Sequence, residues 1–154
     1  MMRQLPPFEI KESELGYIVL SDESILLIRV VIFDIKEVDR IPTGLRFNIG
    51  HNVHVPVIYS PESLKEIVKD RPIAIGDEYV HNLEIWEFVD IIDYKKSKES
   101  CIYKGSDGLT YYISIEVEPT IVSRTLKYRD QFGHPIYFVR WGHKPIIKIL
   151  KENY

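Results

Sequence analysis

The chain has 154 residues, of which 45% are hydrophobic and 28% charged, and its formal net charge at pH 7 is −3. This balance predicts one globular domain over residues 1–154 and excludes a disordered chain. The single cysteine, Cys101, excludes a disulfide within the chain and a cysteine-based metal cage. Because no apolar run approaches the roughly 20 residues of a membrane-spanning helix, we expect no membrane partner.

The N-terminal stretch, MMRQLPPFEI, lacks an apolar core of the length that a signal peptide needs. We therefore expect a cytoplasmic protein, and a chain with one cysteine fits that reducing setting. Residues 1–12 are expected to form a loose N-terminal arm.

The composition is rich in isoleucine and tyrosine, with 23 and 10 residues, whereas Ala74 is the single alanine. Isoleucine and tyrosine suit a half-buried pleated surface and alanine is the best helix former, so the composition favours strands. Glutamine and asparagine are scarce beside lysine and glutamate, a trend of hyperthermophile proteins that AT-rich coding also produces. In size and in its Ile, Tyr, Lys and Glu bias the chain resembles small β-rich proteins of thermophilic archaea. This resemblance carries no motif and implies no function.

The first predicted elements are the strands of a hairpin, 16–20 and 25–38, around the polar turn SDES. A turn over 41–44, marked by proline and glycine, leads into a second long strand over 45–59. In that strand apolar and polar residues alternate with a period of two.

Residues 60–70 form the only convincing helix in the sequence. Ser60 can cap its N-terminus, and Pro61 suits the first helical position. One apolar stripe follows the helical period and consists of Leu64, Ile67 and Val68.

The second half of the chain again reads as strands. Residues 83–94 are strand-like, although their alternation slips near Phe88, as a bulge would produce. The following KKSKES (95–100) is expected to be a solvated loop. Two strands, over 101–104 and 109–118, are predicted to form a hairpin around GSDG. Three further strands then close the chain, over 120–129, 135–141 and 145–150.

The fold class that follows is mainly β, with one short helix at about 60–70. Short, turn-like connections predict a largely antiparallel sheet of about eight strands. Because the strands are long and carry near-continuous apolar stretches, we expect the sheet to curl into a barrel or a barrel-like sandwich.

The histidines do not predict a metal centre. His51 and His54 are three residues apart on a strand and therefore point to opposite faces. His134 and His143 bracket a strand, which at about 3.3 Å per residue separates them by roughly 30 Å and places each at a strand end. His81 lies alone in a loop. We expect neither metal nor cofactor, since phosphate-binding, dinucleotide-binding and nucleophile-elbow motifs are also missing.

Four ionisable residues interrupt the apolar faces of predicted strands: Arg29, His51, Glu87 and Arg124. Buried charges are costly unless they are paired. The four side chains could gather inside the sheet enclosure, where they would orient an anionic ligand or hold a histidine for proton transfer. Alternatively they form structural ion pairs such as Arg29–Glu87, or reach water at the mouths of a barrel.

Basic and aromatic residues interleave over 124–144, which is typical of proteins that bind single-stranded nucleic acid. Two neighbouring core strands with solvated edges would give the same mixture, and the net acidity weighs against phosphate binding. The residues expected to contact nucleic acid or another partner are Lys127, Tyr128, Arg129, Tyr137, Arg140, Trp141 and Lys144.

Charge is unevenly divided along the chain. Residues 119–154 hold seven Lys or Arg and two Asp or Glu, whereas residues 1–118 hold 13 and 21. The two parts could pair head to tail between copies, or cancel between neighbouring strands of one chain. With the long strands and many tyrosines, this asymmetry favours a homodimer.

The leading functional hypothesis is a non-catalytic intracellular interaction module. Its partner would be a second copy, another protein or single-stranded nucleic acid, and no catalytic residue is predicted. The alternative is a small-ligand carrier or an enzyme built on Arg29, His51, Glu87 and Arg124.

Overall fold

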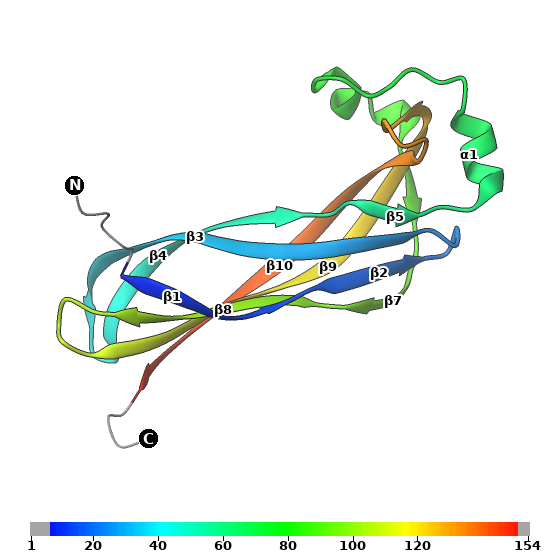
Figure 1. Ribbon diagram of the computed structural model, residues 1–154. Coiled ribbons are helices and arrows are strands. Elements are labelled where there is room, and N and C mark those ends of the chain that lie inside the picture. The colour runs from blue at the N-terminus through cyan, green and yellow to red at the C-terminus, as the bar shows by residue number, and fades with distance from the viewer. Residues whose placement is uncertain (1–6, 151–154) are drawn as a thin grey trace, which may run out of the picture.

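The structure is a computed structural model and describes residues 7–150. It is mainly β, with two sheets of antiparallel strands stacked as a sandwich and one short α-helix, α1 (Glu62–Val68), at one end (Figure 1). The predicted antiparallel β-rich fold is thus confirmed. The strands are β1 (Phe8–Glu14), β2 (Gly16–Leu20), β3 (Ile25–Ile41), β4 (Gly44–His54), β5 (Val57–Tyr59), β6 (Glu87–Val89), β7 (Ile91–Lys95), β8 (Ser97–Lys104), β9 (Thr110–Arg129) and β10 (Pro135–Leu150).

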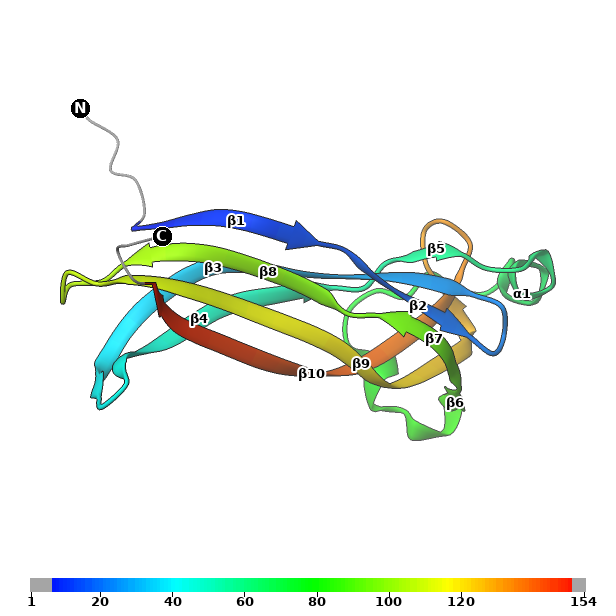
Figure 2. The same ribbon diagram turned by 90° about the horizontal axis from the view of Figure 1, so that it is seen from below.

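The first sheet, sheet I, has the order β1-β8-β9-β10, and β6 pairs with the far part of β9. Figure 2 shows these four strands side by side, with β1 and β10 on the two outer sides. The second sheet, sheet II, has the order β4-β3-β2-β7, and β5 pairs with the beginning of β3. The predicted hairpins β2–β3 and β8–β9 are both present.

The hydrophobic core lies between the sheets. On β3 the even-numbered residues from Leu26 to Ile32 are buried. On β9 the odd-numbered residues from Tyr111 to Val117 are buried in the same cluster. The alternating pattern therefore gives each sheet one inner, apolar face.

The sheets do not close into a barrel, so that prediction is wrong. Within residues 7–150 no backbone pairing joins β4 to β10, the strands on the open side of the sandwich. Here the sheets meet through side chains, with the ring centroids of His51 and His143 5.1 Å apart. The chain passes between the sheets at Leu15, Asp90 and Lys96 on the opposite side, and through the connector with α1 over residues 60–86 at one end. A barrel requires every edge to be paired, and these crossings leave β4 and β10 without a ladder between them.

Helix α1 lies inside the predicted 60–70 segment, and its Leu64 and Val68 are buried. Ser60 does not cap it, because Pro61 occupies the N-cap position and no side chain caps the helix. The Ser60 hydroxyl instead bonds the Nδ1 atom of His134 at 2.5 Å, and both side chains are buried. This bond fastens the start of α1 to the turn before β10.

Two segments that the sequence predicts as continuous strands are interrupted in the structure. Residues 45–59 divide into β4 and β5, and residues 83–94 divide into a 3-10 helix, β6 in sheet I and β7 in sheet II. The slip that the sequence shows near Phe88 thus marks the change of sheet at Asp90, not a bulge.

Three other expectations also need correction. KKSKES is not a loop, because β8 begins at Ser97. His143 lies within β10 rather than at a strand end, whereas His134 directly precedes that strand. Of the predicted N-terminal arm, residues 8–12 belong to β1, and residues 1–6 lie outside the described residues.

Replacing Gly16 by alanine is expected to destabilise the fold by about 3 kcal/mol. A Cβ atom at Gly16 would lie 2.2 Å from the backbone oxygen of Lys95 and 2.7 Å from Cγ2 of Ile28. Gly16 is where the chain enters sheet II between β3 and β7, so neither neighbour can move without disturbing a ladder. Urea denaturation measures the change.

The matched control is Gly142→Ala, because nothing lies within 4 Å of a Cβ at Gly142. That substitution should change the free energy of unfolding by less than about 0.5 kcal/mol. Equal effects at the two glycines would contradict the importance of the close approach at Gly16.

Candidate binding site

An apolar hollow of about 390 Å³ lies between residues 80–88 and the outer face of β9 and β10. We call it the aromatic hollow. Its lining consists of Val80, Leu83, Trp86, Glu87, Phe88, Ile121, Ser123, Phe138 and Arg140.

The floor of the aromatic hollow is one row of sheet I. In the register of β6, β9 and β10, Phe88 lies opposite Ser123, and Ser123 lies opposite Phe138. Residues directly opposite each other project from the same face of a sheet. Their sequence neighbours Val89 and Val139 are buried on the inner face, so Phe88 and Phe138 point outward on both sides of a small serine.

The wall is the connector with the short 3-10 helices η1 (Glu78–His81) and η2 (Leu83–Ile85). Trp86 fixes it, because its indole Nε1 donates to the backbone oxygen of Tyr79 at 3.1 Å. The Trp86 ring meets the Phe138 ring edge-on at 6.3 Å, and the Tyr79 ring contacts that of Tyr128 at 5.4 Å. Aromatic contacts at these spacings hold the wall against sheet I.

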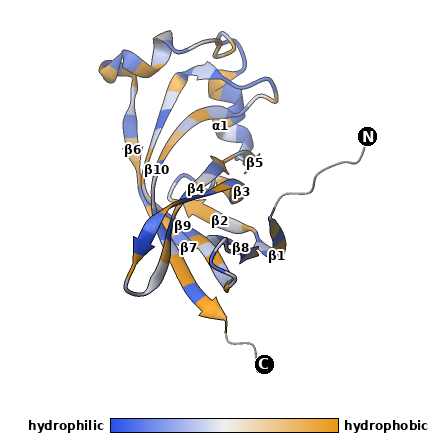
Figure 3. Ribbon diagram, turned by 90° about the vertical axis from the view of Figure 1, so that its left-hand side faces the viewer, coloured by the Kyte–Doolittle hydropathy of each residue, from blue (hydrophilic) through white to orange (hydrophobic). Residues whose placement is uncertain are grey.

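Large apolar side chains around the aromatic hollow are left in solvent. Leu83 is 83% exposed and Phe88 81%, while Phe138 and Ile121 are each more than 40% exposed. Figure 3 shows hydrophobic residues in the connector and in β6 on this side of the molecule. Such a cluster suits an apolar or aromatic group, and Arg140 adds one cationic donor at the rim.

The four residues of the predicted polar cluster do not meet. Arg29 points outward, because the buried face of β3 is the even-numbered one and not the odd-numbered face expected from the sequence. His51 lies on the inner side of β4 beside His143. Only Glu87 and Arg124 are in contact, with Arg124 Nε donating to Glu87 Oε1 at 2.9 Å.

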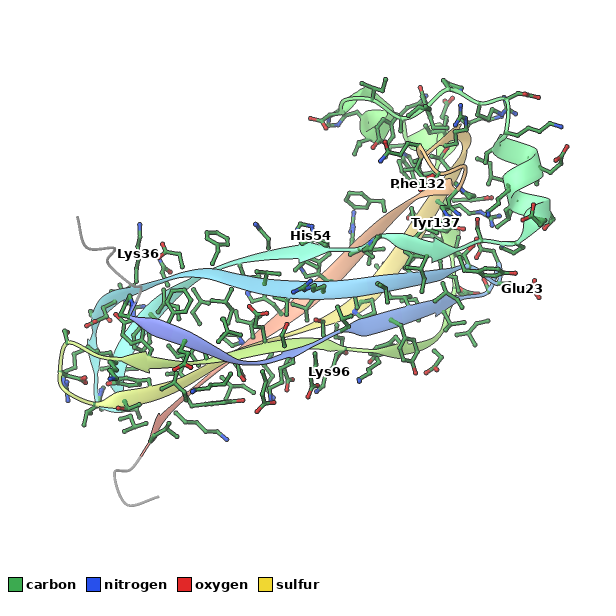
Figure 4. The ribbon with its side chains drawn as sticks, in the orientation of Figure 1. Glu23, Lys36, His54, Lys96, Phe132 and Tyr137 are labelled. Carbon is green, nitrogen blue, oxygen red and sulfur yellow. The ribbon has the colours of Figure 1, made fainter. Side chains whose placement is uncertain are left out.

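Arg124 belongs to a different network, which joins the two sheets. Its Nη1 atom lies 2.8 Å from Oδ2 of Asp22 in the β2–β3 turn, and the Tyr137 hydroxyl donates to that same oxygen at 2.6 Å. The Ser24 hydroxyl lies 2.7 Å from the Tyr137 hydroxyl. Figure 4 shows Tyr137 at the same end of the sandwich as Glu23 of the β2–β3 turn. We call Asp22, Ser24, Arg124 and Tyr137 the Asp22 network.

Burial acts to raise the pKa of the Asp22 carboxyl, but hydrogen bonds from Tyr137, Ser24 and Arg124 hold that pKa below its ordinary value. Burial and the Asp22 charge raise the pKa of the Tyr137 phenol well above its ordinary value. The network therefore holds Asp22 ionised and Tyr137 protonated at neutral pH.

Three of the seven predicted partner-binding residues have structural partners instead. Tyr137 belongs to the Asp22 network, and Tyr128 packs on Tyr79. Arg129 donates from Nε to the backbone oxygen of Arg71 at 2.9 Å, which fixes the connector to the end of β9.

The other four do not line one hollow. Arg140 lines the aromatic hollow, whereas Lys144 lines a separate hollow with His143 and Glu116. Lys127 and Trp141 are exposed but line neither.

The sequence interpretation missed Leu83, Trp86 and Phe88. The six residues LEIWEF hold four large apolar side chains, these three and Ile85, which is a signal for an exposed apolar site. A single strand would divide them between its two faces, and only the break into η2 and β6 shows that Leu83, Trp86 and Phe88 line the same hollow.

Among residues 7–150 no group of three or more His, Cys, Asp or Glu side chains is arranged to hold a metal ion. In the described part of the chain, no helix has both the length and the apolar character needed to cross a membrane. No protein-family model matches the chain, and no curated protein or solved structure matches it. Its function is therefore argued from the geometry.

Proposed function

We propose that the protein is a non-catalytic binding module that takes an apolar or aromatic side chain of a partner protein into the aromatic hollow. The supporting observation is the exposure of Leu83, Phe88, Ile121 and Phe138 around one concave site. Exposed apolar clusters of this kind on soluble proteins mark interaction sites.

The lining resembles the energetic centre of a protein–protein interface. Aromatic side chains and arginine dominate such centres, and the polar groups lie around them. Phe88 and Phe138 supply the apolar contact, and Arg140 can donate to a backbone carbonyl or a carboxylate of the partner. Burying one large apolar side chain of the partner contributes about 2 kcal/mol.

Single-stranded nucleic acid is the second candidate. Phe138 and Arg140 are two residues apart on the outer face of β10, where an aromatic ring could stack on a base and the cation could meet a phosphate. Glu87 in the same lining and the net charge of −3 weigh against it.

Phe88→Ser is expected to weaken binding of an aromatic peptide about tenfold or more. The probe is obtained by selecting a random displayed-peptide library on the parent protein, with enrichment of Trp, Phe or Leu expected. Dissociation constants are then measured by fluorescence anisotropy. Because Phe88 is exposed, its loss should leave the core intact.

The control is Phe33→Ser, since Phe33 is also exposed but lies on β3 in the other sheet. Selection of no apolar peptide, or equal loss of affinity in both variants, would count against the aromatic hollow. If no peptide is selected, and the protein binds oligothymidylate tightly in a way that Arg140→Ala weakens, the result would favour nucleic acid instead.

A further inference from the structure

The two outer strands of sheet I are unusually open. Within residues 7–150 neither β1 nor β10 has a strand on its second side. Along β1 every residue after Phe8 is exposed, and along β10 most residues from Arg140 onward are exposed. A long free edge presents unpaired N–H and C=O groups, which can pair with another chain.

The outer faces of these two strands carry opposite charge. On β1, Glu9 and Glu14 lie opposite Ile102 and Lys98, away from the core. On β10, Lys144 and Lys148 lie opposite Glu116 and Tyr112, also on the outer face. Glu12 is the third carboxylate on the outer face of β1, and Lys11 is the one basic residue of that strand.

The inner faces of the same strands are apolar and incompletely covered. Ile10 is 41% exposed, although it lies opposite buried Cys101. Ile147 and Ile149 are exposed by 38% and 40%, although they lie opposite core residues of β9. Figure 3 shows this last part of β10 as hydrophobic. A strand laid against either edge would cover these side chains.

The strand directions fit a head-to-tail contact. Each neighbouring pair in the order β1-β8-β9-β10 is antiparallel, so β10 runs opposite to β1. Displacing a second copy sideways therefore puts its β1 antiparallel to β10 of the first copy, and the alternation of the sheet continues across the contact.

We propose that β10 of one copy pairs antiparallel with β1 of the next copy, which extends sheet I from molecule to molecule. With Lys148 opposite Glu9, Ile147 lies opposite Ile10. The extra residue of β1 at the Ile10–Glu12 register shift then brings Lys144 opposite Glu14. Outer-face ion pairs and inner-face apolar contacts are thus satisfied in one register.

The charges also favour the β10–β1 contact over the two symmetric contacts, β10–β10 and β1–β1. Pairing β10 with β10 would place lysines against lysines, and pairing β1 with β1 would place glutamates against glutamates. A β10–β1 contact is heterologous, so it generates an open chain or a ring and does not stop at a dimer. It uses none of the exposed apolar side chains of the aromatic hollow and so is independent of the proposed function.

The test is sedimentation velocity of the full chain over a range of concentrations at low and high ionic strength. The parent should form species of more than two chains at low salt and dissociate at high salt, because exposed ion pairs are screened. Lys144→Glu with Lys148→Glu, or Glu9→Lys with Glu14→Lys, should each weaken association about tenfold or more.

The decisive variant combines all four substitutions in one chain. It swaps the charges of both edges and should regain the assembly of the parent, which general damage to the fold could not produce. Lys36→Glu with Lys69→Glu changes the net charge by the same amount as Lys144→Glu with Lys148→Glu, at residues outside β1 and β10, and should leave association unchanged. A parent that remains monomeric at low salt, a species that stops at two chains, or a fourfold variant that folds but stays monomeric would overturn the proposal.

Discussion

Replacing Glu99 by alanine is expected to lower the free energy of unfolding by about 3 kcal/mol. The Glu99 carboxylate is only 3% exposed, and its Oε1 accepts a hydrogen bond from the backbone nitrogen of Ile32 at 2.8 Å. Its Oε2 accepts from the Ser13 hydroxyl at 2.8 Å. Alanine removes the acceptor and leaves a buried N–H group unpaired, which is the costly outcome for a backbone donor.

This arrangement exists because β2 is shorter than β3. Pairing of β2 with β3 ends at Ile28, so the following N–H groups on that side of β3 have no strand beside them. Ser97 and Glu99 of β8 replace the missing strand, with Ser97 Oγ accepting from Val30 and Glu99 from Ile32. The polar side chains thereby join sheet I to the uncovered part of β3.

Urea denaturation of three variants tests this role. Glu99→Gln keeps a carbonyl acceptor for Ile32 and should cost clearly less than Glu99→Ala. Glu62→Ala, whose side chain is 93% exposed, should change stability by less than about 0.5 kcal/mol. A Glu99→Ala effect no larger than that of Glu62→Ala would mean that the Ile32 N–H group finds another partner.

The same residues show where the sequence was insufficient. Because KKSKES is polar throughout, the sequence predicts a solvated loop there, yet Ser97 and Glu99 are buried. Their partners are backbone donors 67 residues away in sequence. Local polarity cannot reveal a strand edge that only the tertiary fold creates, whereas the hairpins and α1 were predictable because their signals are local.

The wrong face of β3 has a different cause. Residues 25–33 are apolar on both faces apart from Arg29, so alternation identifies a strand but cannot choose its buried side. The pairing with β4 then shifts between Ile32 and Asp34, which returns Ile35 to the core. The predicted polar cluster assumes that the odd-numbered residues from 25 to 35 all lie on one face of the strand. The register shift breaks that alternation, so Arg29 and Ile35 lie on opposite faces.

The candidate site was predictable only in part. Arg140 was expected to face a partner and does line the aromatic hollow, because it lies on the outer face of β10. Tyr137, its neighbour three positions earlier, points inward to Asp22. Composition identified the aromatic and basic segment, but the faces of two paired strands decide which of its residues solvent can reach.

Asp22→Asn is expected to cost about 2 kcal/mol at pH 7, and this cost should disappear in acid. The substitution removes the charge that Arg124 and the Tyr137 hydroxyl bond in the native protein. Hydrogen bonds to charged groups stabilise more than neutral ones, and here they connect the β2–β3 turn of sheet II to β9 and β10 of sheet I.

The direction of the pH dependence follows from the lowered pKa of Asp22. Because the folded protein holds that pKa below the ordinary 3.8, the folded state binds fewer protons at this group than the unfolded state does. The stabilisation is therefore fully present above 3.8 and is lost as the pH falls through the folded pKa. The parent and the Asp22→Asn variant should accordingly differ most at neutral pH and converge below 3.8.

Chemical denaturation at pH 7 and at several values below 3.8 measures this convergence. Asp70→Asn, at an exposed carboxylate, is the matched control and should stay within about 0.5 kcal/mol of the parent at pH 7. In an Arg124→Met background, Asp22→Asn should have little further effect, because the cation that pairs with the Asp22 charge is already removed. A cost of Asp22→Asn that persists unchanged in acid would assign the effect to packing of the turn and not to the Asp22 charge.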